Sequence, residues 1–125
     1  MTDTTDTTTT TATIDTWLEA YAEPDTERRA TVVAEVWAAD GFLADPPFEG
    51  TGHDAIAALG GVVLEHYAGH TFRRTTAVDA HHDTARYGWE LVAPDGAVAV
   101  AGLDVATFDA DGRLAKVVGF FGPLG

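Results

Sequence analysis

Length, composition and charge narrow what this chain can be. Its 125 residues fit one domain, and 46% hydrophobic residues suffice for a core around a small-molecule cavity. The 20 acidic and 7 basic residues give a formal net charge of −13, which disfavours binding to nucleic acid and to anionic membranes. Because the chain has no cysteine, disulfides, thiolate nucleophiles and cysteine-based metal sites are excluded.

The sequence also bears on location and source. No apolar run reaches the ~20 residues of a membrane span, and the N-terminus lacks the basic and apolar segments of a signal peptide. We therefore expect a cytoplasmic protein. The alanine-rich composition, with arginine strongly preferred to lysine, is typical of a high-GC bacterial genome.

The N-terminal segment changes character at Ile14. Residues 1–13 are almost entirely threonine and aspartate, which predicts a disordered tail and places the folded domain at residues 14–125. Beyond that point, apolar residues recur at the spacing of one helix face: Ile14, Trp17, Leu18 and Tyr21. This periodicity predicts a first helix, which the proline of Glu23-Pro24-Asp25 ends.

A second helix is predicted directly after that break. Asp25 or Thr26 is placed to cap its start. Its apolar face holds Val32, Val33, Val36 and Trp37. Gly41 is expected to end this helix or to follow its end closely.

The next segment, rich in proline and glycine, predicts a short strand over Phe42–Asp45 and then a loop. Residues Asp54–Tyr67 predict a third helix with apolar residues along one side. The adjacent Gly60 and Gly61 weaken helix propensity, so we expect another part of the chain to pack closely there.

From Thr71 the apolar period changes to two, which is typical of strands. Short turn signals separate four predicted strands: Thr71–Ala80, Thr84–Val92, Ala97–Asp109 and Arg113–Phe121. Three helices followed by an antiparallel meander predict an α+β fold, with a curved sheet wrapped over the helices.

Two aspartates stand out because their neighbours are apolar. Asp45 lies in Phe42–Phe48, and Asp104 lies in a strand of valine, alanine, leucine and glycine. A buried carboxyl has a raised pKa, which suits acid–base chemistry near neutral pH. Two structural explanations stay open: Asp45 before a proline can cap a turn, and Asp104 can face solvent with Arg86 or Lys116 opposite it.

The order of elements, the stretch Ala44-Asp45-Pro46-Pro47-Phe48-Glu49-Gly50 and the Val117–Gly122 end resemble the NTF2-like (SnoaL-like) superfamily. The resemblance covers about residues 14–124. It implies a cone-shaped fold, in which a strongly curved antiparallel sheet and three helices enclose an apolar pocket. The superfamily includes steroid isomerases, polyketide cyclases, dehydratases and non-catalytic binding domains.

Ketosteroid isomerase is the most informative member for comparison. Its general-base aspartate in an Asp-Pro loop matches Asp45, and its protonated oxyanion-hole aspartate on a late strand matches Asp104. Its third group, a tyrosine of the first helix, falls on Trp17 here, and Tyr21 lies one turn further on the same face. This departure weighs against steroid isomerisation itself and leaves a two-aspartate acid–base pocket.

The resemblance therefore implies a cofactor-independent enzyme of isomerase, cyclase or dehydratase type, with a hydrophobic carbonyl compound as substrate. Asp45 is the expected general base, and Asp104, helped by Trp17 or Tyr21, the expected oxyanion donor. Four aromatic residues are expected to line the substrate pocket: Phe48, Tyr87, Trp89 and Phe121. The alternative is a non-catalytic domain that binds a hydrophobic molecule or serves as a dimerisation module.

No metal site is expected. His81-His82-Asp83 reads as a solvated turn, since adjacent strand residues point to opposite faces. His66 and His70 lack a third ligand nearby. A homodimer is expected, because this family commonly covers the outer face of its sheet with a second subunit and the outward residues here are apolar: Val98, Leu103 and Val105.

Overall fold

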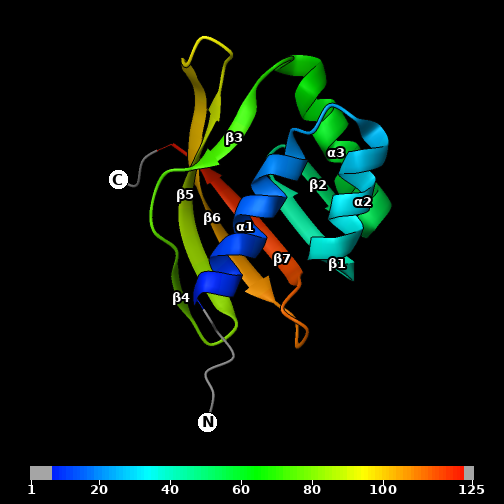
Figure 1. Cartoon of the computed structure of the whole chain (residues 1–125), viewed down its shortest axis with the longest axis vertical. Helices are drawn as coiled ribbons and strands as arrows, with labels where there is room; N and C mark the ends of the chain where they lie inside the picture. The colour runs from blue at the N-terminus through cyan, green and yellow to red at the C-terminus, as the bar shows by residue number, and fades with distance from the viewer. Residues whose placement is uncertain (1–6, 123–125) are drawn as a thin grey trace.

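The computed structural model describes residues 7–122 of the chain. Three helices, α1 (Thr7–Tyr21), α2 (Thr26–Val36) and α3 (His53–His66), pack against one curved sheet. Figure 1 shows α1 lying across the sheet, with α2 and α3 beside it over β1 and β2. The fold is the α+β cone expected from the sequence.

The sheet contains seven strands in the order β2-β1-β7-β6-β5-β3, with β4 also paired to β5. Their bounds are β1 Trp37–Asp45, β2 Phe48–Thr51, β3 Thr71–Arg74, β4 Asp79–His81, β5 Thr84–Val92, β6 Val98–Phe108 and β7 Leu114–Phe121. Pairing is antiparallel except between β1 and β7, which run parallel. The sheet is therefore mixed, and the expected antiparallel pairing fails at one place. Strand β7 lies between β6 and β1, and it is antiparallel to β6 but parallel to β1.

The N-terminal boundary also differs from the prediction. Helix α1 begins at Thr7, so residues 7–13 are helical, and residues 1–6 of the predicted tail lie outside the described residues. The hydroxyls of Thr13 and Thr16 donate to carbonyls four residues earlier, and Thr10 is buried. These contacts accommodate threonines in a helix that their propensity alone disfavours.

Helix α2 begins as predicted, because the Asp25 side chain accepts a hydrogen bond from the Arg28 backbone N–H at 3.1 Å. It ends earlier than predicted, at Val36. Trp37 is extended and buried at the start of β1, and its ring lies over Gly41, where an added Cβ would be 2.5 Å from it. Gly41 therefore permits close packing inside a strand and does not end the helix.

Two further differences concern short strands. The segment predicted as a loop after Asp45 contains β2, which pairs with β1 across the Pro46–Pro47 turn. The long strand predicted from Thr71 is divided into β3 and β4. Two hydrogen bonds hold the break against β5. The Thr75 backbone N–H donates to the Gly88 carbonyl, and the Gly88 backbone N–H donates to Thr76 Oγ1.

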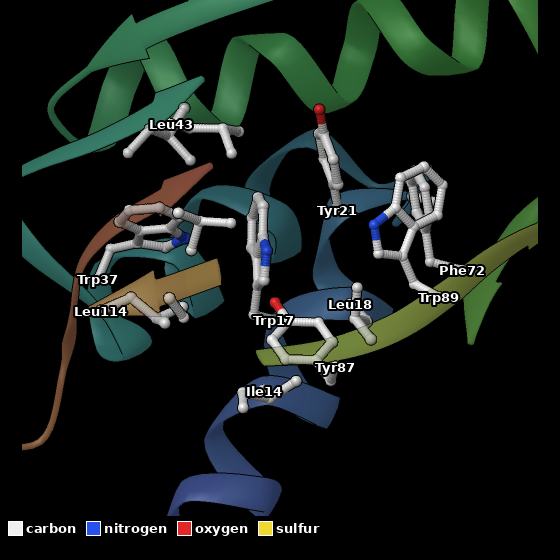
Figure 2. Close-up of a cluster of buried hydrophobic side chains, with 14 of the residues drawn as sticks. Ile14, Trp17, Leu18, Tyr21, Trp37, Leu43, Phe72, Tyr87, Trp89 and Leu114 are labelled. Atoms are coloured by element: carbon white, nitrogen blue, oxygen red, sulfur yellow. The ribbon is translucent and has the colours of Figure 1, made fainter. Parts of the chain in front are cut away.

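The core fills the space between α1 and the sheet. The apolar face predicted for α1 is buried, with Ile14, Trp17, Leu18 and Tyr21 all below 5% exposed. Figure 2 shows Trp17 and Tyr21 between Trp37 on one side and the Phe72–Trp89 pair on the other. This aromatic core fixes the position of Tyr21, which matters for the site below.

The predicted close approach at Gly60 and Gly61 is confirmed. The Arg29 side chain, 5% exposed, crosses α3 at this point and donates from Nε to the Ala57 carbonyl at 2.8 Å. It also donates from Nη1 to the Glu23 carbonyl. A Cβ on Gly60 would lie 2.6 Å from Arg29 Cδ, so the glycine pair makes room for this buried cation.

Candidate active site

Four residues form a row across the middle of the sheet. Asp45 ends β1, Gly119 lies in β7, Asp104 in β6 and Tyr87 in β5. Asp104 pairs with Gly119 on one side and with Tyr87 on the other. The parallel register of β1, in which Ala44 pairs with Val118, brings Asp45 beside Gly119.

Gly119 creates a hollow between the two carboxyl groups. A Cβ atom built on it would lie 2.7 Å from Asp45 Oδ1 and 3.1 Å from Asp104 Oδ1. The two Oδ1 atoms are therefore separated by no more than the sum of these distances. A side chain at position 119 would have to displace one carboxyl group, so the glycine lets both turn toward the same point.

Each carboxyl group is held by one tyrosine. Tyr21 Oη donates to Asp45 Oδ2 at 2.7 Å, and Tyr87 Oη donates to Asp104 Oδ2 at 2.9 Å. Both bonds use Oδ2, which leaves both Oδ1 atoms directed toward the hollow at Gly119. Asp45 Oδ1 is buried and has no hydrogen-bond partner among the described residues.

Burial is the main reason why the pKa values of Asp45 and Asp104 are raised. Asp45 is 8% exposed and Asp104 6% exposed. Loss of hydration raises the pKa of Asp45, against a smaller lowering by the Tyr21 hydrogen bond. Loss of hydration, together with the charge of Asp45, raises the pKa of Asp104 from its ordinary 3.8 to about 7, while the Tyr87 hydrogen bond opposes the rise.

The Trp89 indole lies on the same side of the sheet as Asp104 and slightly lowers the pKa of its carboxyl. Its Nε1 is buried and forms no hydrogen bond of ordinary geometry within the described part of the chain. The hydrogen bond from the Tyr87 hydroxyl is therefore the defined side-chain hydrogen bond to Asp104.

Both tyrosines act as donors. Burial, with the nearby aspartate charges, raises the pKa of Tyr21 and of Tyr87 well above 10. Tyr21 is stacked between Trp17, at 4.6 Å between ring centroids, and Phe72, at 4.8 Å. This stacking fixes the Tyr21 hydroxyl on Asp45, so the bond needs little ordering when a ligand arrives.

A cavity of about 290 Å³ opens beside Asp45. Its walls come from the β1–β2 turn, the end of α3 and the neighbouring ends of the strands. The residues that border it are Asp45, Pro46, Pro47, Phe48, Val63, His66, Tyr67, Phe72, Trp89, Leu91, Val100 and Phe121. Asp45 is the one carboxyl among these residues, and most of the wall is apolar.

The predicted site residues fall into three groups. Phe48, Trp89 and Phe121, expected in the pocket wall, border the cavity together with Asp45. Asp104 lies next to Asp45 at Gly119 without bordering the cavity. Tyr87 and Trp17, both 1% exposed, are core residues and are not among the residues that border it.

This arrangement differs from the one implied by ketosteroid isomerase. Tyr21, expected beside Asp104 as an oxyanion donor, is bonded to Asp45, the expected base. Trp17, at the position of the family's tyrosine, packs edge-on against Trp37 and stacks on Tyr21. Tyr87, expected to line the pocket, holds Asp104 instead, because its β5 position faces Asp104 across the ladder.

The two structural alternatives for the aspartates do not describe this structure. Arg86 pairs with Val105 and Lys116 with Thr107, so neither lies opposite Asp104 in the ladder. Asp45 precedes the Pro46–Pro47 turn, but the hydrogen bond to its side chain comes from Tyr21 of α1. Both carboxyl groups thus belong to the interior.

Gly119 and His66 complete the site beyond the predicted residues. Gly119 makes room for the two carboxyl groups. His66, which the sequence does not place in a site, borders the cavity. The i, i+3, i+4 spacing of Val63, His66 and Tyr67 on one side of α3 is the signal that could have identified this wall.

Two other findings bear on the function classes. No group of three or more His, Asp or Glu residues that could hold a metal ion occurs within residues 7–122. In the same part of the chain, no helix is long and apolar enough to cross a membrane.

Comparison with known proteins gives matches among solved structures. No family model and no curated protein matches the chain. A candidate isomerase of the SnoaL-like family from Agrobacterium tumefaciens is 33% identical, with a TM-score of 0.87 over 93% of this chain and 99% of that one. Because that identity extends over nearly the whole of both chains, this protein belongs to the SnoaL-like family.

More distant structures share the fold alone. A candidate SnoaL-like polyketide cyclase from Jannaschia is 17% identical, with a TM-score of 0.71 over 91% of this chain and 85% of that one. An NTF2-like protein of unknown function from Exiguobacterium is also 17% identical, with a TM-score of 0.66 over 90% of this chain and 99% of that one. The NTF2-like fold expected from the sequence is thus confirmed.

Proposed function

We propose that this protein is a small acid–base enzyme of isomerase or cyclase type that acts on a hydrophobic carbonyl compound without a cofactor. The observation that carries the proposal is Asp45, which borders an apolar cavity and whose buried Oδ1 has no hydrogen-bond partner among the described residues. A ligand atom is the natural partner for such an oxygen, because an unsatisfied buried acceptor is costly. The candidate isomerase and cyclase names of the similar structures agree with this class.

The proton equilibria of the pair support separate roles for the two carboxyl groups. Asp104 holds its proton up to about pH 7, and the charge of Asp45 is one reason. In the working form, Asp45 is therefore the ionised group and Asp104 the neutral one. When two carboxyl groups in one site have different pKa values, the one that ionises first can act as the base and the one that keeps its proton as the acid.

In the proposed step, Asp45 Oδ1 takes a proton from the carbon next to the substrate carbonyl. The electron pair of that C–H bond forms a carbon–carbon double bond, and the carbonyl oxygen gains the negative charge. Asp104 does not border the cavity, so the carbonyl oxygen must enter the hollow at Gly119 to accept a hydrogen bond from the Asp104 carboxyl. For a substrate with a carbon–carbon double bond one carbon beyond the acidic carbon, return of the proton from Asp45 to the far end of that bond completes an isomerisation. Attack of the enolate carbon on a second carbonyl of the substrate forms a ring, and the resulting alkoxide takes back the proton from Asp45 to complete a cyclisation.

Proton exchange on a simple ketone tests this proposal without knowledge of the natural substrate. We expect the protein to accelerate exchange of the C–H protons beside the carbonyl of 2-tetralone in D2O, followed by proton NMR. Asp45→Asn should reduce the protein-dependent rate by about 100-fold or more, as expected for loss of a general base. Asp79→Asn, at an exposed carboxyl paired with Arg86, is the matched control and should leave the rate unchanged.

Two results would separate the alternatives. If wild type and Asp45→Asn exchange the ketone protons at the same rate, Asp45 is not the base. If wild type binds 2-tetralone without accelerating exchange, the protein is a non-catalytic domain that binds a hydrophobic molecule.

A homodimer is also proposed, on the outer face of the sheet. Phe120 is 53% exposed in β7, and its neighbours Leu103, Val105 and Val118 are only half-buried there. The described helices pack on the opposite face, so a second copy of this chain is the proposed cover (Figure 1). Sedimentation should give a dimer at micromolar concentration, and Phe120→Asp should shift it to monomer. A wild-type monomer would contradict the proposal.

A further inference from the structure

His66 places a second polar group on the cavity wall, apart from Asp45. It is the last residue of α3 and is exposed, whereas Asp45 is buried at the end of β1. The wall contributed by Phe72, Leu91 and Val100 is apolar. The cavity therefore offers a ligand one polar contact inside and another at its exposed rim.

The hydrogen bonding of His66 decides what its free nitrogen can recognise. Nδ1 lies 3.1 Å from the backbone carbonyl of Val62, which can only accept a hydrogen bond. Nδ1 therefore carries the proton, and in the neutral imidazole Nε2 is left as an acceptor. No described residue donates to Nε2 in this structure, so the nitrogen is available to a ligand.

The volume of the cavity limits the ligand. At about 290 Å³, the cavity lies at the small end of ligand pockets, which range over roughly 300–1,000 Å³. A compound of one or two rings fits this volume better than a large polycyclic molecule.

We infer that His66 is a specificity-determining residue that accepts a hydrogen bond through Nε2 from a hydroxyl at the outer end of the ligand. The preferred ligand is then a compact apolar hydroxyketone, with the carbon next to its carbonyl at Asp45 and its hydroxyl at His66. This inference rests on the proposed function, because it takes Asp45 as the inner anchor of the same ligand.

Two ketones that differ at one distal group test the inference. In 6-hydroxy-2-tetralone the far ring carries a hydroxyl, and in 6-methoxy-2-tetralone the same oxygen has no hydrogen to donate. Calorimetric titration of wild type should show about fivefold tighter binding of the hydroxyl compound, the effect of one hydrogen bond. His66→Phe should abolish this preference, and His66→Gln, which keeps an acceptor, should retain part of it.

Two matched variants locate the effect. His81→Phe changes an exposed histidine that is not among the residues bordering the cavity, so it should keep the full preference. Tyr67→Phe removes the hydroxyl group of the neighbouring residue on the same wall and should also keep the preference. Loss of the preference in Tyr67→Phe but not in His66→Phe would assign recognition to Tyr67 and overturn the inference.

The remaining outcomes distinguish this inference from the proposed function. Equal binding of the two ketones by wild type, with exchange still dependent on Asp45, overturns the role of His66 alone. Failure of every ketone to bind contradicts the assigned ligand class, and then both proposals fall.

Discussion

Two glycine-lined hollows in this molecule hold buried charged groups, and they differ in how completely those groups are bonded. At Gly60 and Gly61, the Arg29 guanidinium bonds the carbonyls of Ala57 and Glu23. At Gly119, two carboxyl groups face one another, and Asp45 Oδ1 has no partner among residues 7–122.

This difference in hydrogen bonding distinguishes a polar group buried for structural reasons from one buried in a functional site. Arg29 joins α2 to the end of α1 and to α3, and its bonds are made within the folded chain. The pair at Gly119 places two acidic groups together, which folding alone does not favour. The Arg29 charge is bonded to backbone carbonyls within the fold, which indicates a structural role, whereas Asp45 leaves one acceptor without a partner among residues 7–122 and borders a cavity, which indicates a site.

The largest stability effect should come from the structural hollow. Arg29→Met leaves the Ala57 and Glu23 carbonyls without their donor, so we expect a loss of about 3 kcal/mol in the free energy of unfolding. Arg28→Met, at a side chain 73% exposed, is the neighbouring control and should cost less than about 0.5 kcal/mol. Urea unfolding measures both. Equal stability of the two variants would show that the buried bonds of Arg29 contribute little.

The hollow at Gly119 should tolerate a methyl group poorly. Gly119→Ala puts a Cβ 2.7 Å from Asp45 Oδ1, so we expect about 2 kcal/mol of destabilisation and slower ketone exchange. Asp45→Ala removes the nearer obstacle. In the Asp45→Ala variant, Gly119→Ala should therefore reduce the free energy of unfolding clearly less than in wild type. Urea unfolding of wild type, both single variants and the double variant measures this difference. Additive costs would mean that the methyl group and the Asp45 carboxyl do not conflict.

A third effect concerns the pH dependence of stability. Because the folded pKa of Asp104 is raised to about 7, its proton favours folding at acid pH, and this contribution is lost as pH rises from about 4 through 7. Asp104→Asn does not titrate, so its melting temperature should rise relative to wild type by on the order of 10 °C between pH 4 and pH 8. Asp79→Asn, at an exposed carboxyl, should show no such trend. A variant that loses stability relative to wild type over this range would mean that the site favours the ionised carboxylate.

Part of this site was predictable from the sequence. Asp45 and Asp104 stand out by their apolar neighbours, and hairpin geometry supplies two of their contacts. Equal numbers of residues separate Tyr87 and Asp104 from the Asp95–Gly96 turn, and the same holds for Asp104 and Gly119 about Asp111–Gly112. However, the hairpins close one register earlier, at Ala93–Ala97 and Asp109–Arg113, and a β-bulge in each then sets the pairing at the site.

The contact between Asp45 and Gly119 could not be predicted in this way. It depends on the parallel pairing of β1 with β7, which joins distant parts of the chain and which local periodicity does not encode. The Tyr21–Asp45 bond likewise requires the tertiary packing of α1 against the sheet. The extension of α1 to Thr7 was missed because the helix propensity of a threonine run gives way to packing and to hydroxyl back-bonding.

The central claim is that Asp45 and Asp104 share one interior site in which Asp104 keeps its proton near neutral pH. Carbon-13 NMR of the aspartate side-chain carboxyls, titrated from pH 3 to pH 9 and assigned with Asp104→Asn and Asp45→Asn, tests it directly. We expect the Asp104 carboxyl to titrate with a pKa near 7, and Asp45 to lose its proton first, above its ordinary 3.8. An Asp104 carboxyl that ionises at or below 3.8 would contradict the account.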